Sequence, residues 1–239
     1  MSFSAPIRPA RSERPLFIAG ALLAALVIFA GFARTFYLKG LFGTPPLSSL
    51  LMTHGVVMTL WIVLFIAQIA LVANGRTGLH RRLGLLGGCV AVLIVVMGVA
   101  AAIDAGRRGF TPASQITPLM FMAIPIIDVG VFGTLVGAAL LKRRRAATHK
   151  RLMLLATLGI VTPGAARLPL DFIKQGGLPA FFGVMIACVL TVVVIDTVRN
   201  RRLHPAFGWG AALLIASVPL RIALAQTAEW QQFAAWLLR

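Results

Sequence analysis

The composition of this 239-residue chain excludes an ordinary soluble globular protein, because 59% of its residues are hydrophobic, 12% are charged and its mean hydropathy is +0.92. A net charge of +17 would indicate nucleic-acid binding in a soluble chain. Here, however, the Lys and Arg residues lie between apolar runs, where loop orientation and anionic lipid headgroups account for them, so we predict an all-α polytopic membrane protein that binds no nucleic acid.

Seven apolar runs are each about long enough to cross the ~30 Å hydrocarbon layer at 1.5 Å per residue. The expected spans are residues 16–36, 47–73, 83–102, 118–141, 152–169, 178–198 and 206–225. Pro163-Gly164 interrupts the fifth span, which predicts a kink or a re-entrant end there. We expect one transmembrane domain over residues 16–225, with a four-helix core of spans two to five at residues 47–169.

Polar segments flank this domain at both ends. Residues 1–15 are polar and basic and are expected to form a cytoplasmic tail. Residues 226–239 are expected to form an external amphipathic tail. Its apolar side chains are typical of a helix that lies in the membrane interface: Trp230, Phe233, Trp236 and Leu237.

The basic residues predict how the chain is oriented. With seven spans, 15 Lys and Arg residues fall on the side of the amino terminus and 8 on the other side. The positive-inside rule then places the amino terminus in the cytoplasm and the carboxyl terminus in the periplasm of a bacterial inner membrane. Two loops, at residues 76–83 and 142–152, supply 9 of those 15 residues.

The same two loops contain one histidine each. When the two loops are aligned, Leu-His-Arg-Arg-Leu around His80 matches Thr-His-Lys-Arg-Leu around His149. Spans two and three would then correspond to spans four and five as parallel hairpins, although matching basic loops also arise without duplication. If the repeat holds, His80 and His149 lie at equal depth on the cytoplasmic side.

Two imidazoles at equal depth on facing helices are the ligands that a six-coordinate haem iron needs. Small residues near His80 would leave room for a porphyrin: Gly84, Gly87 and Gly88. Nearby guanidinium groups would pair with its propionates: Arg81, Arg82 and Arg151. The alternative is that both histidines simply lie in basic interfacial loops that fix the topology and hold no ligand.

A family resemblance favours the haem interpretation. His54-Gly55-Val56-Val57-Met58, with Gln68 in the same span and Leu79-His80 at the start of the next, resembles the ascorbate-dependent transmembrane b-type cytochromes, the cytochrome b five-six-one family. The resemblance covers residues 47–158 and implies four helices whose histidines bind two haems, one near each membrane face. His54, His80 and His149 match three of the family's four ligands.

Span four has no histidine for the fourth ligand, so the resemblance implies at most one b-type haem, bound by His80 and His149. The chain also resembles bacterial membrane proteins of unassigned function, through its Phe-Ala-Arg-Thr-Phe-Tyr, His-Gly and His-Arg-Arg-Leu-Gly segments. This second resemblance is closer in pattern but implies no chemistry.

Ionisable residues also occur in the external half of the spans. Asp128 falls near the middle of span four, where a charge costs at least ~2.5–3.5 kcal/mol on insertion scales, so we expect it to have a partner or to carry a proton. His54 is the candidate partner. Arg34, Arg167 and Asp171 lie near span ends and would line an outward cavity that binds an anionic or quinone-type ligand. Such residues can equally reach the headgroups or be solvated.

Two functional hypotheses follow. In the first, the protein is a transmembrane oxidoreductase with one b-type haem on His80 and His149, and it passes electrons from a cytoplasmic donor to a quinone or an external acceptor. His54 and Asp128 would handle protons, and a redox partner protein, a homodimer or a larger complex would be involved. In the second, it is a haem-free transporter, sensor or assembly subunit that works through the external polar cluster. The lipid bilayer and its anionic lipids are partners in both.

Overall fold

The computed structural model describes residues 13–111 and 116–239, so residues 1–12 of the expected amino-terminal tail lie outside the described part. Within these ranges the regular secondary structure is entirely helical, and six helices are long and apolar enough to cross a membrane. This confirms an all-α polytopic membrane fold. The elements are α1 (Arg14–Phe32), the π-helix η1 (Ala33–Tyr37), α2 (Ser49–Ala73), α3 (Thr77–Arg107), α4 (Pro118–Leu141), α5 (Ala146–Gly159), α6 (Thr162–Ala165), α7 (Asp171–Asn200), α8 (Pro205–Ala225) and α9 (Ala228–Leu237).

Local sequence signals explain where several of these helices begin. The Ser48 hydroxyl accepts a hydrogen bond from the backbone N–H of Leu51 at 3.3 Å, which caps α2. The Thr117 hydroxyl caps α4 in the same way, 3.2 Å from the N–H of Met120, and Pro118 follows at the first helical position. These caps place the starts of α2 and α4 within two residues of the predicted spans.

The two basic loops are shorter than the hydropathy pattern predicts. α3 begins at Thr77 and α5 at Ala146, each six residues before the start of the expected span. The apolar pattern marks only the part of a helix inside the hydrocarbon layer, whereas a helix whose side chains reach water continues past it. As a result His80 and His149 are each the fourth residue of a helix, and their N–H groups bond to the carbonyls of Arg76 and Arg145 at 3.1 and 2.9 Å.

The expected fifth span is broken, as the Pro163-Gly164 pair predicts. α5 ends at Gly159 and the short α6 starts at Thr162, so the break falls just before the proline. The turn lets α6 touch α1 closely: a Cβ atom built on Gly31 would lie 2.0 Å from the carbonyl oxygen of Gly164. Only glycine at position 31 permits this approach.

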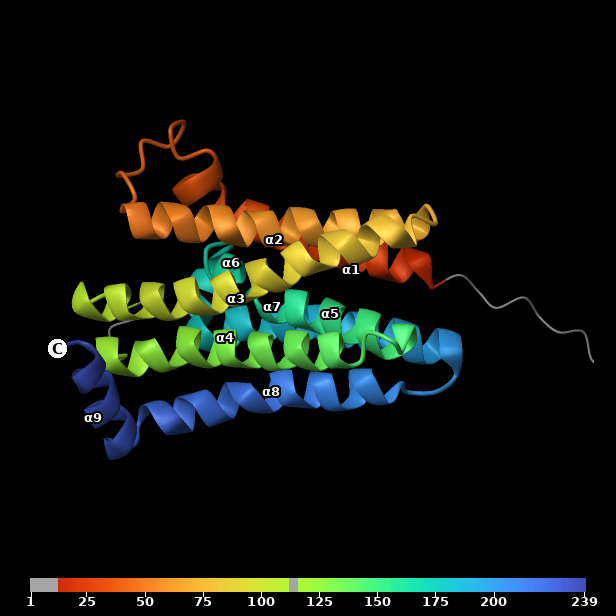
Figure 1. Ribbon diagram of the computed structural model, residues 1–239. Helices are drawn as coiled ribbons and strands as arrows, with labels where there is room; N and C mark the ends of the chain where they lie inside the picture. Colours follow the sequence, from red (N-terminus) through yellow and green to blue (C-terminus); the bar gives the residue numbers. More distant parts are fainter. Residues whose placement is uncertain (1–12, 112–115) are drawn as a thin grey trace, which may run out of the picture.

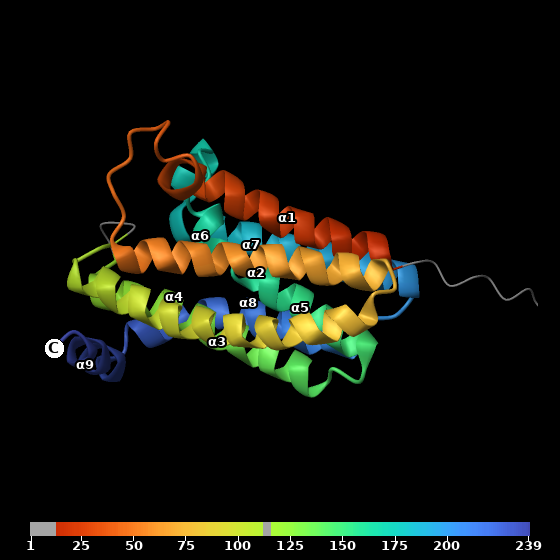
Figure 2. The ribbon, with the colours of Figure 1, turned by 45° about the horizontal axis from the view of Figure 1, so that its top comes forward.

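α5 lies at the centre of the bundle (Figures 1 and 2). It packs against α1, α4, α7 and α8, and Leu152, Leu154 and Leu155 are fully buried. The packed core therefore extends beyond the four helices α2 to α5 that the sequence predicts. Apolar side chains on the outside of the bundle remain exposed, such as Leu85 at 78%, which suits a surface in contact with lipid.

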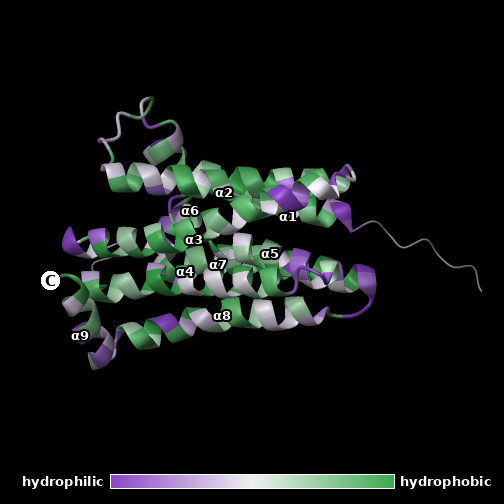
Figure 3. Ribbon diagram, viewed as in Figure 1, coloured by the Kyte–Doolittle hydropathy of each residue, from purple (hydrophilic) through white to green (hydrophobic). Residues whose placement is uncertain are grey.

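The two ends of the bundle differ in character. The start of α1 and the α2–α3, α4–α5 and α7–α8 loops meet at one end, here called the basic end, and these loops are hydrophilic in Figure 3. α9 lies at the opposite end, and α6 lies in the half of the bundle nearer to that end. In α9 the Trp230 indole N–H donates to the carbonyl of Leu119 at 2.8 Å, while Trp236 is 62% exposed, so one side of the helix packs on the bundle and the other is exposed.

Candidate functional site

His80 and His149 face each other at the basic end of the bundle. Their ring centroids are 6.4 Å apart and the ring planes are inclined by 80°. Both residues are partly buried, and each lies in the first turn of its helix, on α3 and α5. The structure thus brings together the histidine pair that the aligned loops predict.

The hydrogen bonds of the two rings differ. His149 Nδ1 lies 2.9 Å from the carbonyl oxygen of Ala139. A carbonyl only accepts, so Nδ1 donates this hydrogen bond and Nε2 is the ring nitrogen left for a metal. His80 Nδ1 is buried and has no hydrogen-bond partner among the described residues, and the carbonyl of His80 accepts from the Gln68 amide at 3.2 Å. An unpartnered buried nitrogen in a native site calls for a ligand or a water molecule.

Open space lies along α3 one to two turns beyond His80. Gly84, Gly87 and Gly88 lie four, seven and eight residues after His80, on the same helix face. A Cβ atom on Gly87 or Gly88 would meet nothing within 4 Å, and one on Gly84 would meet only the Gln68 amide nitrogen, at 3.7 Å. Two imidazoles beside a glycine-rich helix face are the residue types that would hold a haem. Groups of three or more His, Cys, Asp or Glu side chains that could hold a metal ion are not found in the described residues.

The guanidinium groups expected to pair with haem propionates have different surroundings. Arg81 and Arg82 are exposed in the first turns of α3. Arg151 is buried and already bonded: it donates to both Asp196 carboxylate oxygens at 3.0 and 2.6 Å and to the Ala147 carbonyl at 3.0 Å. The predicted propionate role of Arg151 is therefore corrected, because its donors serve this internal network.

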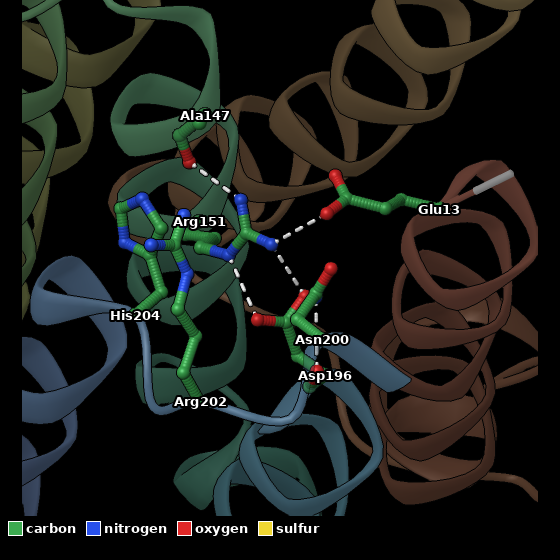
Figure 4. A pocket seen from close by; sticks show the side chains of 7 residues that line it. All are labelled: Glu13, Ala147, Arg151, Asp196, Asn200, Arg202 and His204. Carbon is green, nitrogen blue, oxygen red and sulfur yellow. Dashed lines mark hydrogen bonds and ion pairs between the residues drawn. The ribbon is translucent and has the colours of Figure 1, made fainter. Parts of the chain in front are cut away.

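Glu13 completes this network at the start of α1 (Figure 4). Its carboxylate accepts from Arg151 at 2.8 Å and also bonds to Lys150. Burial alone would raise the pKa of Glu13, but the hydrogen bonds and charges of Lys150 and Arg151 outweigh it and lower the pKa from 4.5 to about 2. The network of Glu13, Lys150, Arg151 and Asp196 thus joins α1, α5 and α7 through ionised groups.

A small cavity of about 130 Å³ lies beside this network. His204 lines it and caps α8, since its Nδ1 accepts from the N–H of Ala206 at 3.1 Å. Burial lowers the pKa of His204, and the nearby Arg151 charge lowers it further, which favours the neutral ring whose Nδ1 accepts this bond. Sequence reasoning assigned no role to Glu13, Asp196 or His204. The sequence did contain a signal for Asp196: the chain has only 6 acidic residues, and Asp196 is one that falls inside an apolar run.

Asp128 has a partner other than the predicted one. Its carboxylate pairs with Arg221 on α8, whose guanidinium also donates to the hydroxyl of Ser217 at 2.6 Å. Arg221 is only 1% exposed. His54, the partner expected from the sequence, instead has a buried Nδ1 with no hydrogen-bond partner in the described part of the chain. The sequence identifies the burial of Asp128 but not its partner, because α4 and α8 are distant in the chain.

The three residues expected to line an outward cavity lie exposed and make separate contacts. Arg34 lies over the Phe42 ring at 5.0 Å, and Arg167 donates to the carbonyl of Pro163 at 2.8 Å. Asp171 pairs with Lys174 at 3.2 Å, one turn along α7. Hydrogen bonds or ion pairs that link Arg34, Arg167 and Asp171 to one another are absent from the described part of the chain.

Comparisons with known proteins assign no family. The chain matches no protein-family model, no curated protein and no solved structure. The resemblance to b-type cytochromes therefore stays a prediction from the residues named above, and the function is argued from the site itself.

Proposed function

We propose that this membrane protein binds one b-type haem through His80 and His149 and works as an electron-transfer protein. The observation that carries the proposal is the 6.4 Å separation of the two imidazole centroids. One imidazole lies in the first turn of α3 and the other in the first turn of α5. Two imidazoles that bind one metal from opposite sides, each through a bond of about 2 Å, place their ring centres roughly 6 Å apart. The observed separation supports shared ligation of one iron.

Bound haem supplies reversible one-electron transfer, and the chain supplies its ligands and surroundings. The Ala139 carbonyl holds the His149 ring through Nδ1 and leaves Nε2 as the nitrogen that would bind a metal, as in metal sites where the second ring nitrogen is hydrogen-bonded. Gln68 holds the first turn of α3 through the His80 carbonyl. Arg81 and Arg82, which are exposed at the start of α3, are the proposed partners of the propionates.

The proposed donor is cytoplasmic, and the acceptor is a quinone or an external molecule. The excess of Lys and Arg residues at the basic end supports this direction, because the positive-inside rule favours a cytoplasmic position for the end that carries His80 and His149. His54 remains the candidate proton carrier in the opposite half, since its buried Nδ1 has no hydrogen-bond partner within residues 13–111 and 116–239. Asp128 is assigned a structural role instead, because Arg221 holds its carboxylate.

The alternative, a haem-free transporter, sensor or assembly subunit with an outward polar cavity, has less support. Its expected residues Arg34, Arg167 and Asp171 are exposed and make separate contacts.

The proposal is tested by the absorbance of the purified full-length protein from cells supplied with a haem precursor. We expect a reduced-minus-oxidised spectrum with Soret and α bands, at about one haem per chain. A preparation that is folded, by circular dichroism, and has no such bands at stoichiometric level would exclude the electron-transfer function.

A further inference from the structure

An open groove of about 710 Å³ lies between α2 and α3 at the basic end. Its walls are apolar: Ala67, Ala70 and Leu71 on α2, and Leu79 and Leu83 on α3. Asn74 and Arg76, in the turn between the two helices, form its polar end. Its volume falls in the range of sites that hold a small organic ligand, roughly 300–1,000 Å³.

The polar end of the groove carries positive charge that nothing neutralises in the described residues. Arg76 is exposed, and its guanidinium has no hydrogen bond or ion pair there. The backbone N–H groups of Gly78 and Leu79, in the first turn of α3, also have no acceptor within the described ranges. A guanidinium beside free amides at the start of a long helix favours an anion, phosphate above all.

The apolar walls continue from this end into the hydrocarbon layer. Ala67 lies seven residues before Asn74 on α2, which corresponds to about 10 Å along the helix axis. A ligand that fills the groove therefore needs an anionic group at the interface and an apolar chain of at least this length. A neutral quinone headgroup would leave the Arg76 charge unpaired, whereas a phospholipid satisfies both ends of the groove.

We propose that this groove binds one anionic phospholipid, with its phosphate on Arg76 and the first-turn amides of α3 and an acyl chain along Ala67, Ala70 and Leu71. The site holds the α2–α3 turn against the membrane surface. Lipid binding at this site does not depend on haem. Because Leu79 and Leu83 lie on either side of His80 in the sequence, a bound lipid also covers the helix turn that carries His80.

The test is native mass spectrometry of the full-length protein in detergent with added phosphatidylglycerol or phosphatidylcholine. We expect at least fivefold tighter binding of phosphatidylglycerol, and a fivefold to tenfold loss of that affinity in Arg76→Gln. Arg145→Gln is the matched control, because Arg145 occupies the same N-cap position on α5 but does not line the groove. Ala70→Trp fills the apolar wall and should weaken binding of both lipids while Arg76 is retained.

Four results would overturn the proposal. These are equal binding of the two lipids, equal losses in Arg76→Gln and Arg145→Gln, unchanged binding in Ala70→Trp, or displacement of the lipid by glycerol phosphate at equal concentration. Displacement of phosphatidylglycerol by an equimolar neutral quinone would assign the groove to quinone instead. Circular dichroism of each variant confirms that a loss of binding does not come from unfolding.

Discussion

The carboxylate of Asp128, halfway along α4, pairs with the guanidinium of Arg221 on α8, inside the apolar part of the bundle. Arg221 also bonds to the carbonyl and the hydroxyl of Ser217 and lies over the Phe182 ring at 4.9 Å. Neither charge has an easy route to water, so each depends on the other. The pair joins α4 to α8 across the packed core.

Removing one member of this pair should destabilise the protein strongly. We expect Arg221→Met to lower the free energy of unfolding by about 3–5 kcal/mol, because Asp128 then stays buried without a countercharge. The double replacement Asp128→Leu, Arg221→Met should recover much of that loss. Arg107→Gln, an exposed change at the end of α3, is the control and should cost under about 0.5 kcal/mol. Thermal unfolding in detergent measures all four proteins, and a mild effect of Arg221→Met would show that the pair is not coupled.

The bonds of Glu13 predict a pH dependence of stability. Its pKa is about 2 in the folded protein against an ordinary 4.5, so the folded state favours the ionised carboxylate. A lowered pKa gives stability that is fully present above about pH 4.5 and is lost as the pH falls toward 2. Because the side chain is 29% exposed, we expect only about 1 kcal/mol from it rather than the full value of the shift.

Comparison of Glu13→Gln with the wild type measures this contribution. The wild type should be more stable at pH 7, and the difference should shrink between about pH 4.5 and pH 2. Glu229→Gln is the control, since Glu229 starts the peripheral α9 and lies outside the network. A stability difference that stays constant down to pH 2 would contradict the assigned role of Glu13.

The contact between α1 and α6 predicts that position 31 accepts only glycine. Gly31→Ala places a methyl group against the Gly164 carbonyl, and backbone cannot move aside as a flexible side chain would. We expect a loss of about 2–3 kcal/mol in unfolding free energy. Gly130→Ala is the matched control, because nothing lies within 4 Å of its added methyl group and helix propensity favours Ala. Equal stability of the two variants would show that α1 can move away from α6.

Open space beside His80 gives a prediction about haem content. Gly88→Leu would fill the open face of α3, where no atom lies within 4 Å of an added Cβ. We expect the variant to fold with wild-type stability and to lose most of its haem. Haem content is measured by pyridine haemochrome absorbance, and full retention would place the macrocycle elsewhere.

Sequence reasoning predicted the elements of this fold well, because apolar runs and basic loops are local signals. The start and end of α4 and the break before Pro163 agree with the hydropathy pattern. The alignment of the two basic loops predicts that His80 and His149 lie close together, as they do. Helix extension beyond the hydrocarbon layer was missed, since the polar first turns of α3 and α5 have no hydropathy signal.

Long-range partners were the other part that the sequence did not reveal. The sequence predicts that Arg151 binds a cofactor, whereas in the structure it pairs with Asp196. It predicts His54 as the partner of Asp128, whereas the observed partner is Arg221. Each of these pairs joins helices that are distant in the chain, and no spacing rule connects them. The central position of α5, packed by α1, α7 and α8, was hidden for the same reason.

The central claim is that His80 and His149 share one haem iron, and the most direct test is the haem content of two double variants. We expect His80→Ala, His149→Ala to fold and to lose the reduced α band entirely. The matched variant His54→Ala, His204→Ala should keep about one haem per chain. The account would be contradicted if His80→Ala, His149→Ala kept about one haem per chain, or if only His54→Ala, His204→Ala lost its haem.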